Sequence, residues 1–111
     1  MLKKKNRIIS SVVFEGIFRK GEVKENECFK IIFRKNDLDY PRYGIVVSTK
    51  VSKFAVERNT LKRKIRNILR DFLLVFSKGF DVVITVKKNC LKTSFSKLKE
   101  SLKELLLKLF K

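Results

Sequence analysis

The chain has 111 residues and carries 28 Lys and Arg against 11 Asp and Glu, so its formal net charge at pH 7 is +17. With 44% hydrophobic residues it can bury a core, which excludes a disordered polycation. It contains no histidine, which excludes imidazole-based triads, His-containing zinc sites and histidine acid–base chemistry. We therefore expect one folded domain over residues 1–111 that binds a polyanion and has no catalytic or metal-ligating residue of its own.

Two cysteines and the N-terminal segment bear on the cellular compartment. Cys28 and Cys90 are too few for a disulfide scaffold and lack the paired spacing of a metal knuckle. Cysteine is commonly buried as a small apolar residue, so we expect two free, buried thiols. The basic and apolar start of the chain resembles a signal peptide, but Ser10, Ser11 and Glu15 interrupt it well short of an export segment or a membrane span. We therefore expect a soluble, cytoplasmic protein with no membrane association.

The first half of the chain predicts one helix followed by two or three strands. Apolar residues four apart predict a helix over about residues 10–20, capped by one of its first two serines and ended by Gly21. A brief extended piece around residues 22–24 precedes a strand over residues 28–34, in which apolar and basic residues alternate. A second strand over residues 42–48 follows a polar loop around the only proline, and this short connection predicts an antiparallel hairpin.

The second half predicts two amphipathic helices with a buried strand between them. Residues 55–76 place apolar side chains on one helical face. Gly79 ends this segment, and the β-branched run over residues 80–86 is typical of a strand inside a sheet. Leucines three and four apart then predict a C-terminal helix, capped by Thr93 or Ser94. The order α-β-β-β-α-β-α predicts an α/β (α+β) two-layer sandwich, with three helices on a small, mostly antiparallel, four-stranded sheet.

Positive charge is concentrated in residues 58–70, within the predicted helix over residues 55–76. This segment holds six basic residues within about thirteen positions and no acidic residue, so its cations repel one another. Arg63, Arg66 and Arg70 project nearly opposite the apolar face, and the planar guanidinium group suits bidentate phosphate binding. A solvated charged face is the alternative, and it applies equally to the two lysines in the preceding loop. The candidate nucleic-acid-binding residues are Lys50, Lys53, Arg58, Asn59, Lys62, Arg63, Arg66 and Arg70.

Phe14 and Phe18 lie one turn apart on the first predicted helix. Aromatic residues on a short helix normally belong to the core, but Val13 and Ile17 already supply an apolar pair there. An aromatic row beside a basic groove is how proteins stack unpaired nucleotides. The spacing by itself leaves core packing and nucleotide stacking both open.

Four motifs occur in order along the chain: Phe14-x-x-x-Phe18-x-x-Gly21, Gly44-Ile-Val-Val-Ser-Thr-Lys50, Ala55-Val-Glu-Arg-Asn-x-x-Lys-Arg-x-x-Arg66 and Asp81-Val-Val-Ile. With them, the chain resembles the bacterial ribonuclease P protein component over essentially its whole length. The resemblance implies the small subunit of a ribonucleoprotein endonuclease that removes the 5′ leader from precursor tRNA. It implies that the RNA subunit is the catalyst and requires Mg²⁺, and that the protein itself binds no cofactor. The implied partners are the catalytic RNA and precursor tRNA, with no stable protein partner.

The resemblance also assigns a fold detail and roles to individual residues. The family has a left-handed strand-helix-strand connection through the basic helix, against the general right-handed rule. Phe14 and Phe18 look like the aromatic residues that line the leader cleft, and Lys87 looks like the basic residue near it, at the end of the last strand. The residues that look like the family's RNA-facing helix are Arg58, Asn59, Lys62, Arg63 and Arg66. The departures from the family pattern are Thr60, commonly arginine; Ser52, usually glycine; Asn89, often proline or glycine; and Ile32, which can be aromatic.

Other functions also fit a basic RNA-binding helix. A structural ribosomal protein or an RNA chaperone would use the same helix without promoting cleavage. A DNA-binding module agrees less well with the sequence, because no helix-turn-helix spacing or dimer seam is visible. A self-sufficient nuclease agrees least, because the chain has neither histidine nor an acidic cluster.

Overall fold

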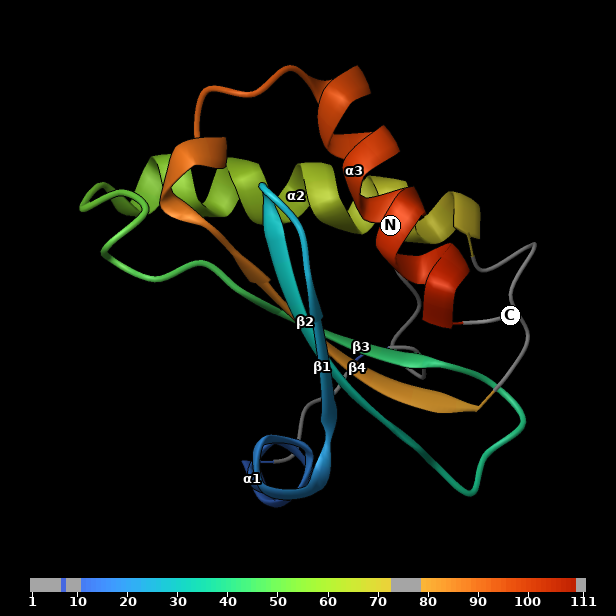
Figure 1. The fold of residues 1–111 in the computed structure, drawn as a ribbon. Coiled ribbons are helices and arrows are strands. Elements are labelled where there is room, and N and C mark those ends of the chain that lie inside the picture. The colour runs from blue at the N-terminus through green and yellow to red at the C-terminus, as the bar shows by residue number, and fades with distance from the viewer. Residues whose placement is uncertain (1–6, 8–10, 73–78, 110–111) are drawn as a thin grey trace.

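The chain folds into three α-helices and a four-stranded sheet, in the predicted order α-β-β-β-α-β-α. The structure is a computed structural model that describes residues 7, 11–72 and 79–109 (Figure 1). Its elements are α1 (Ser11–Lys20), β1 (Glu22–Glu25), β2 (Phe29–Lys35), β3 (Arg42–Val46), α2 (Ala55–Phe72), β4 (Phe80–Val86), the short 3-10 helix η2 (Lys88–Cys90) and α3 (Phe95–Leu109). These bounds agree closely with the prediction; positions 10 and 73–76 of the predicted helices lie outside the described residues.

The strand order differs from the sequence-based expectation. The sheet runs β1-β2-β4-β3; β2 is antiparallel to both β1 and β4, whereas β3 and β4 are parallel. The predicted antiparallel hairpin between the strands over residues 28–34 and 42–48 is therefore wrong, because β4 lies between them. Val82, Val83 and Ile84 are fully buried on the two faces of β4, and such a strand favours a central position. The less buried β3 takes the edge of the sheet.

A buried carboxylate ties the connection between β2 and β3 to the central strand. Asp81 is 1% exposed and accepts hydrogen bonds from Arg42 Nε at 2.8 Å and Arg42 Nη2 at 2.7 Å. Asn36 Nδ2 donates to the same carboxylate at 2.9 Å. The hydrogen bond to Asp81 raises the pKa of the Arg42 guanidinium. Since Asn36 and Arg42 flank the connection, these bonds hold both of its ends beside the start of β4 while compensating a buried charge.

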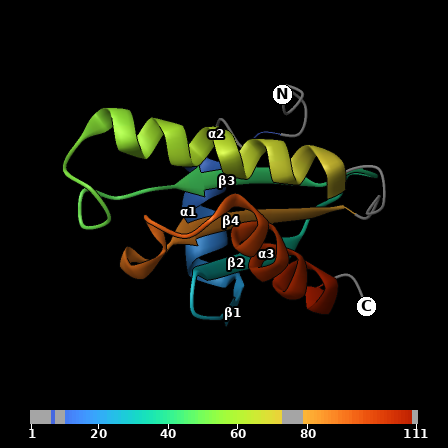
Figure 2. The same cartoon turned by 90° about the horizontal axis from the view of Figure 1, so that it is seen from above.

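The parallel pairing of β3 with β4 requires α2 to cross over the sheet between them. Figure 2 shows this connection from the helical side: the chain leaves β3, returns along α2 above the sheet, and enters β4 on the side of β2. The connection is left-handed in Figure 2, as the resemblance implies, whereas nearly all such connections are right-handed. Because β3 is the edge strand, α2 lies along one edge of the molecule.

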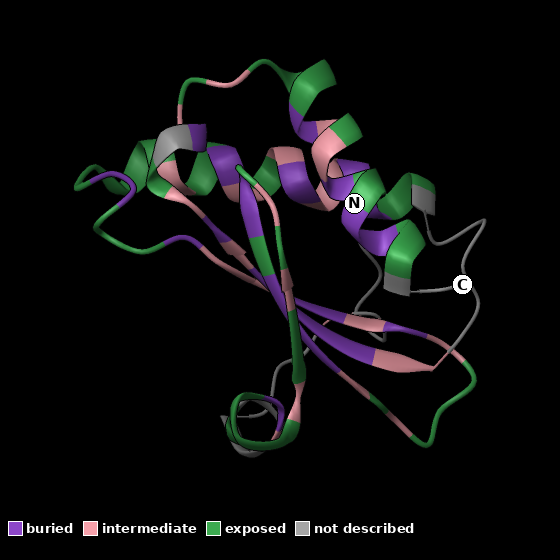
Figure 3. Cartoon of the chain, viewed as in Figure 1, coloured by how far each residue is buried: buried purple, intermediate pink, exposed green. Residues whose placement is uncertain are grey.

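Helices cover the two faces of the sheet unequally. α2 and α3 pack on one face, and the short α1 packs on the other (Figure 1). The main core lies between the sheet and the α2/α3 layer, where buried residues gather in Figure 3. On the opposite face, Ile17 of α1 forms a smaller buried cluster with Ile32 and Val83.

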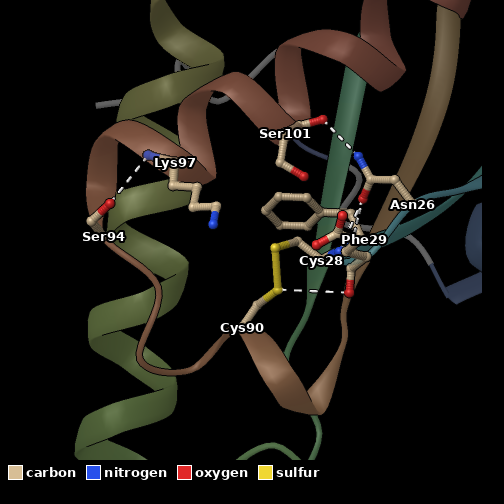
Figure 4. Close-up of a disulfide and its surroundings, with 8 residues drawn as sticks. Asn26, Cys28, Phe29, Cys90, Ser94, Lys97 and Ser101 are labelled. Carbon is tan, nitrogen blue, oxygen red and sulfur yellow. Dashed lines mark hydrogen bonds between the residues drawn. A yellow bond between two sulfur atoms is a disulfide. The ribbon is translucent and has the colours of Figure 1, made fainter.

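Cys28 and Cys90 form a disulfide (Figure 4), which corrects the expectation of free thiols. Both residues are buried, as predicted. Phe29 of β2 lies opposite Val86 of the antiparallel β4, so the residue before β2 and the η2 turn after β4 meet at one end of the sheet. The two Cα atoms are 5.3 Å apart, which suits a disulfide. The two cysteines are 62 residues apart along the chain, so their proximity could not be predicted from local sequence patterns.

Candidate nucleic-acid interface

A hydrogen-bonded cap fixes where α2 begins. The Oγ atom of the buried Ser52 accepts a hydrogen bond from the Phe54 backbone N–H at 3.2 Å and donates to Glu57 Oε1 at 2.6 Å. Arg58 Nη1 donates to the Ser52 carbonyl oxygen at 2.9 Å. Such side-chain contacts order the chain where helical N–H groups lack intrahelical partners. Ser52 therefore organises the loop, and Arg58 has one donor engaged within the protein.

Beyond this cap, α2 has an apolar face and a polar one. The periodicity assigns six residues to the core, and four of them are buried in it: Leu61, Ile65, Ile68 and Leu69. The side chain of Phe72 and the whole of Val75 lie outside the described part of the chain. The polar side spans an arc of about 100°, and we call its residues the basic face: Asn59, Lys62, Arg63, Arg66 and Arg70. Asn59, Arg63 and Arg70 are exposed, and Lys62 and Arg66 are half-buried. The core thus holds one side of the helix and leaves the cations on the other.

Within the described residues, neighbouring carboxylates do not neutralise the basic face. Among the residues that the structure describes, no Asp or Glu oxygen lies within 4.0 Å of a Lys or Arg nitrogen of this face. The surface of α3 is different: Lys99 lies 3.7 Å from Asp71, and Lys108 lies 3.7 Å from Glu104. A row of cations on a rigid helix without nearby counter-charges favours binding of a polyanion.

Positive charge continues into the loop before α2. Lys50 and Lys53 are both exposed, as a phosphate-binding role requires. Val47 and Val51 are buried in the main core and anchor this loop. The Val51 N–H also donates to the carbonyl oxygen of Ser48 at 3.0 Å and closes a turn. The two predicted lysines therefore project from an ordered segment that leads directly into the basic face.

Phe54 lies between these lysines and the helix and belongs to none of the candidate binding residues predicted from the sequence. Its side chain is 59% exposed, and Lys53 Nζ lies 5.5 Å from its ring centroid. Phe54 lies seven residues before Leu61, where the periodicity of α2 would place it on the apolar face, so no signal in the sequence identifies it as a surface aromatic residue. Val56, in the first turn, is 77% exposed.

On the opposite side of the sheet, α1 exposes a second aromatic ring. Phe18 is 52% exposed, whereas the preceding Ile17 is fully buried against Ile32 and Val83. This exposure disagrees with core packing of Phe18, and nucleotide stacking stays a prediction. Phe14 lies in α1 as predicted, but its side chain is outside the described part of the chain.

The sheet beside α1 carries polar residues that the helix does not cover. Strand residues alternate between faces, so the paired Glu25, Lys30 and Thr85 share the face on which α1 packs. Lys30 is exposed. Lys87 directly follows β4; its Nζ lies 3.4 Å from a Glu25 carboxylate oxygen, and its N–H donates to the Cys28 carbonyl at 2.8 Å. These contacts hold Lys87 at one end of the sheet, where Glu25 offsets part of its charge.

The described ranges contain neither a cluster of metal ligands nor a membrane-spanning helix. No group of three or more His, Cys, Asp or Glu side chains there could hold a metal ion. None of the helices in those ranges is long and apolar enough to cross a membrane.

Comparison with known sequences points to a single family. A family model described as Ribonuclease P matches residues 2–110. The chain is 49% identical over 75 residues to the ribonuclease P protein component of Thermotoga petrophila, a match that covers 68% of this chain and 63% of the relative. It is 38% identical over 110 residues to that of Pseudanabaena sp., which covers 97% and 94%. The chain thus matches less than two thirds of the length of the Thermotoga relative and nearly all of the Pseudanabaena one.

Comparison with solved structures gives the same result for the fold. The RNase P protein from Thermotoga maritima superposes with a TM-score of 0.83 at 39% sequence identity, covering 90% of this chain and 94% of that one. A Staphylococcus aureus RNase P protein mutant, described as defective in mRNA degradation activity, superposes with a TM-score of 0.86 at 28% identity, covering 93% and 86%. The mixed α/β fold, its four strands and its three helices are shared with these proteins.

Proposed function

The chain belongs to the ribonuclease P protein family, and from this premise we propose that it is the protein subunit of a ribonucleoprotein endonuclease that removes the 5′ leader from precursor tRNA. In this proposal the catalytic groups and the Mg²⁺ belong to the RNA partner, and the chain supplies binding energy. The observation that carries the proposal is the basic face of α2, whose cations have no carboxylate within ion-pair distance among the described residues.

The basic face, with Lys50, Lys53 and Arg58, is proposed to bind the catalytic RNA. Its arginines donate in pairs to phosphate oxygens, and Asn59 can reach a ribose hydroxyl or a base edge. Neutralising phosphates lets the RNA fold and bind metal ions at lower cation concentration. If about six to eight phosphates are contacted, the logarithm of the binding constant falls against the logarithm of salt concentration with a slope of about −5 to −7.

The uncovered side of the sheet next to α1 is proposed to hold the single-stranded leader. Phe18 offers an exposed ring on which an unpaired base can stack, and we assign the same role to Phe14. Lys87 and Lys30 supply positive charge for the leader phosphates. Because mature tRNA has no leader, contacts here favour binding of the precursor over the product.

The test is multiple-turnover cleavage of precursor tRNA by the cognate catalytic RNA at low Mg²⁺ concentration. We expect the chain to stimulate cleavage, and the double variant Arg63→Glu/Arg66→Glu to lose the stimulation while it keeps the wild-type circular dichroism spectrum. Absence of stimulation by the wild-type chain would refute the proposal. Co-purification with ribosomes and not with a discrete catalytic RNA would favour the alternative, a structural ribosomal protein or RNA chaperone.

We also place this proposed subunit in the cytoplasm with its RNA partner. Disulfides are rare in the reducing cytosol. In that compartment Cys28 and Cys90 would exchange between the disulfide and a buried dithiol, according to the redox poise of the cell.

A further inference from the structure

We infer that Phe54 is a stacking site for an unpaired RNA base, separate from the leader-binding side of the sheet. This inference rests on the proposed RNA-binding role of α2 and adds a specific base contact to it. A single exposed apolar side chain is common and needs no explanation. Three further observations distinguish Phe54 from such a residue: its backbone anchoring, the cation at its ring, and the charge around it.

The first observation is that hydrogen bonds hold the backbone of Phe54 on both sides. Its N–H donates to Ser52 Oγ at 3.2 Å, and its carbonyl oxygen accepts from the Arg58 N–H at 3.1 Å. Ser52 is itself buried and bonded to Glu57. The ring, 59% exposed, is therefore presented from a fixed backbone. A preorganised aromatic side chain loses less conformational entropy when a ligand stacks on it.

The second observation is the cation at the ring. Lys53 Nζ lies 5.5 Å from the ring centroid of Phe54, within cation–π range. A base that stacks on Phe54 takes the opposite face of the ring, and the ammonium group is then available to a phosphate of the same strand. Aromatic rings beside cations are the usual elements of single-strand recognition, because every base has a π-face and every linkage a charge.

The third observation is the sign of the surrounding charge, which decides between an RNA and an apolar protein partner. Lys50 and Lys53 precede the ring, and Arg58 and Lys62 follow it at one and two helical turns. The nearest carboxylate along the helix, Glu57, accepts a hydrogen bond from Ser52 at 2.6 Å. An occupant that combines an aromatic face with negative charge matches this surface, and a nucleotide has both properties.

The experiment uses the absence of tryptophan from the chain. The Phe54→Trp variant carries one fluorophore at the inferred site, and the background substitution Phe18→Ala removes the proposed leader contact. The probes are single-stranded oligouridylate and oligoadenylate of about ten nucleotides and an abasic ribose-phosphate chain of equal length. We expect both base-bearing oligonucleotides to quench the tryptophan, and the abasic chain to leave its fluorescence unchanged. Phe95→Trp is the matched control at a 43% exposed position on α3, and we expect no quenching there.

Affinity measurements in the same Phe18→Ala background complete the test. We expect Phe54→Ala to weaken binding of the base-bearing oligonucleotides about 5- to 100-fold and to leave binding of the abasic chain unchanged. Phe54→Tyr should preserve the affinity, and Val56→Ala, which removes a non-aromatic exposed side chain from the adjoining first turn of α2, should have no effect.

Several results would overturn the inference. Equal losses for base-bearing and abasic chains would mean that Phe54 only positions the cationic loop. A lowered melting temperature of Phe54→Ala would mean a structural role. If Phe54→Ala left the RNA affinity unchanged but abolished binding of another protein, Phe54 would belong to a protein interface. Each of these results leaves stimulation of precursor cleavage intact, whereas failure of that stimulation with normal quenching would refute only the proposed function.

Discussion

The buried position of Tyr43 changes the acid–base chemistry of its side chain. It is 2% exposed within the main core, and its hydroxyl finds no hydrogen-bond partner among the described residues. Burial disfavours the charged phenolate and so raises the pKa of Tyr43 above its ordinary value near 10. An unpaired buried hydroxyl also costs free energy relative to an apolar group.

Stability at alkaline pH tests this description. The unfolded phenol releases its proton near pH 10 and the folded one retains it, so the unfolded state binds fewer protons above that pH. We expect the free energy of unfolding to fall with a contribution from Tyr43 of about 1.4 kcal/mol per pH unit above pH 10. Chemical denaturation of wild type and Tyr43→Phe at several pH values isolates this contribution from that of the lysines. Parallel pH profiles for the two proteins would contradict it.

Phe18 is the corresponding case on the surface. Its ring is 52% exposed beside a core residue, Ile17, which already provides the apolar anchor of α1. Removal of the ring should therefore affect a bound nucleotide more than the fold.

We predict that Phe18→Ala weakens binding of precursor tRNA by about 1 to 3 kcal/mol when the leader is long enough to reach the ring. The loss should disappear for mature tRNA, because that RNA lacks the stacked base. Equilibrium binding to substrates with a series of leader lengths measures the effect. Equal losses for precursor and mature tRNA, or a marked drop in melting temperature, would instead identify Phe18 as part of the fold.

At the scale of one element, α2 combines charge repulsion on one side with burial of apolar side chains on the other. Like charges along the basic face repel one another and destabilise the helix. Burial of Ile65, Ile68 and Leu69 on the other side offsets this cost, at about 1.5 to 3 kcal/mol for each fully buried side chain. The cap formed by Ser52 and Glu57 secures the first turn. The helix can therefore remain folded when no phosphate neutralises its cations.

The salt dependence of RNA binding tests the basic face directly. We predict that Arg66→Ala reduces the steepness of the plot of log binding constant against log salt concentration by about one unit, because one phosphate contact is lost. Lys103→Ala is the matched control, since it removes an exposed cation from α3. An unchanged slope for Arg66→Ala would mean that Arg66 contacts no phosphate and is an ordinary solvated surface charge.

At the scale of the whole molecule, the sheet separates two surfaces. The crossover places α2 on one face along the β3 edge, and α1 lies on the other face (Figures 1 and 2). In the proposed function, the catalytic RNA and the leader therefore bind to different residues and do not compete. The Cys28–Cys90 disulfide joins the start of β2 to the turn after β4, next to the backbone contact between Cys28 and Lys87.

Reduction of this disulfide should lower stability without changing the fold. Because it connects residues separated by 62 positions, we expect its loss to cost about 2 to 4 kcal/mol, chiefly through greater freedom of the unfolded chain. Urea denaturation with and without reductant measures the difference. The double variant Cys28→Ser/Cys90→Ser should be insensitive to reductant, and equal stability of oxidised and reduced wild type would contradict the prediction.

Local patterns in the sequence by themselves determined the elements and much of the candidate site. The two periodicities located the strands and helices. Hydroxyl capping limited the cap of α3 to Thr93 or Ser94, and in the structure Ser94 Oγ accepts a hydrogen bond from the Lys97 N–H at 3.4 Å. The same periodicity separated the buried Leu61 and Ile65 from the cations of the basic face. These properties depend on residues within a few turns of one another, so they can be read along the chain.

Only the tertiary structure decided what depends on distant partners. The position of β4 between β2 and β3 follows from burial of both its faces and from the Arg42–Asp81 contact across the sheet. The arrangement of strands and helices also decides three local features. It brings Cys28 to Cys90 and Lys87 to Glu25, and it leaves Phe18 and Phe54 exposed. A short loop is compatible with either strand order, and the choice is made by the free energy of packing the whole core.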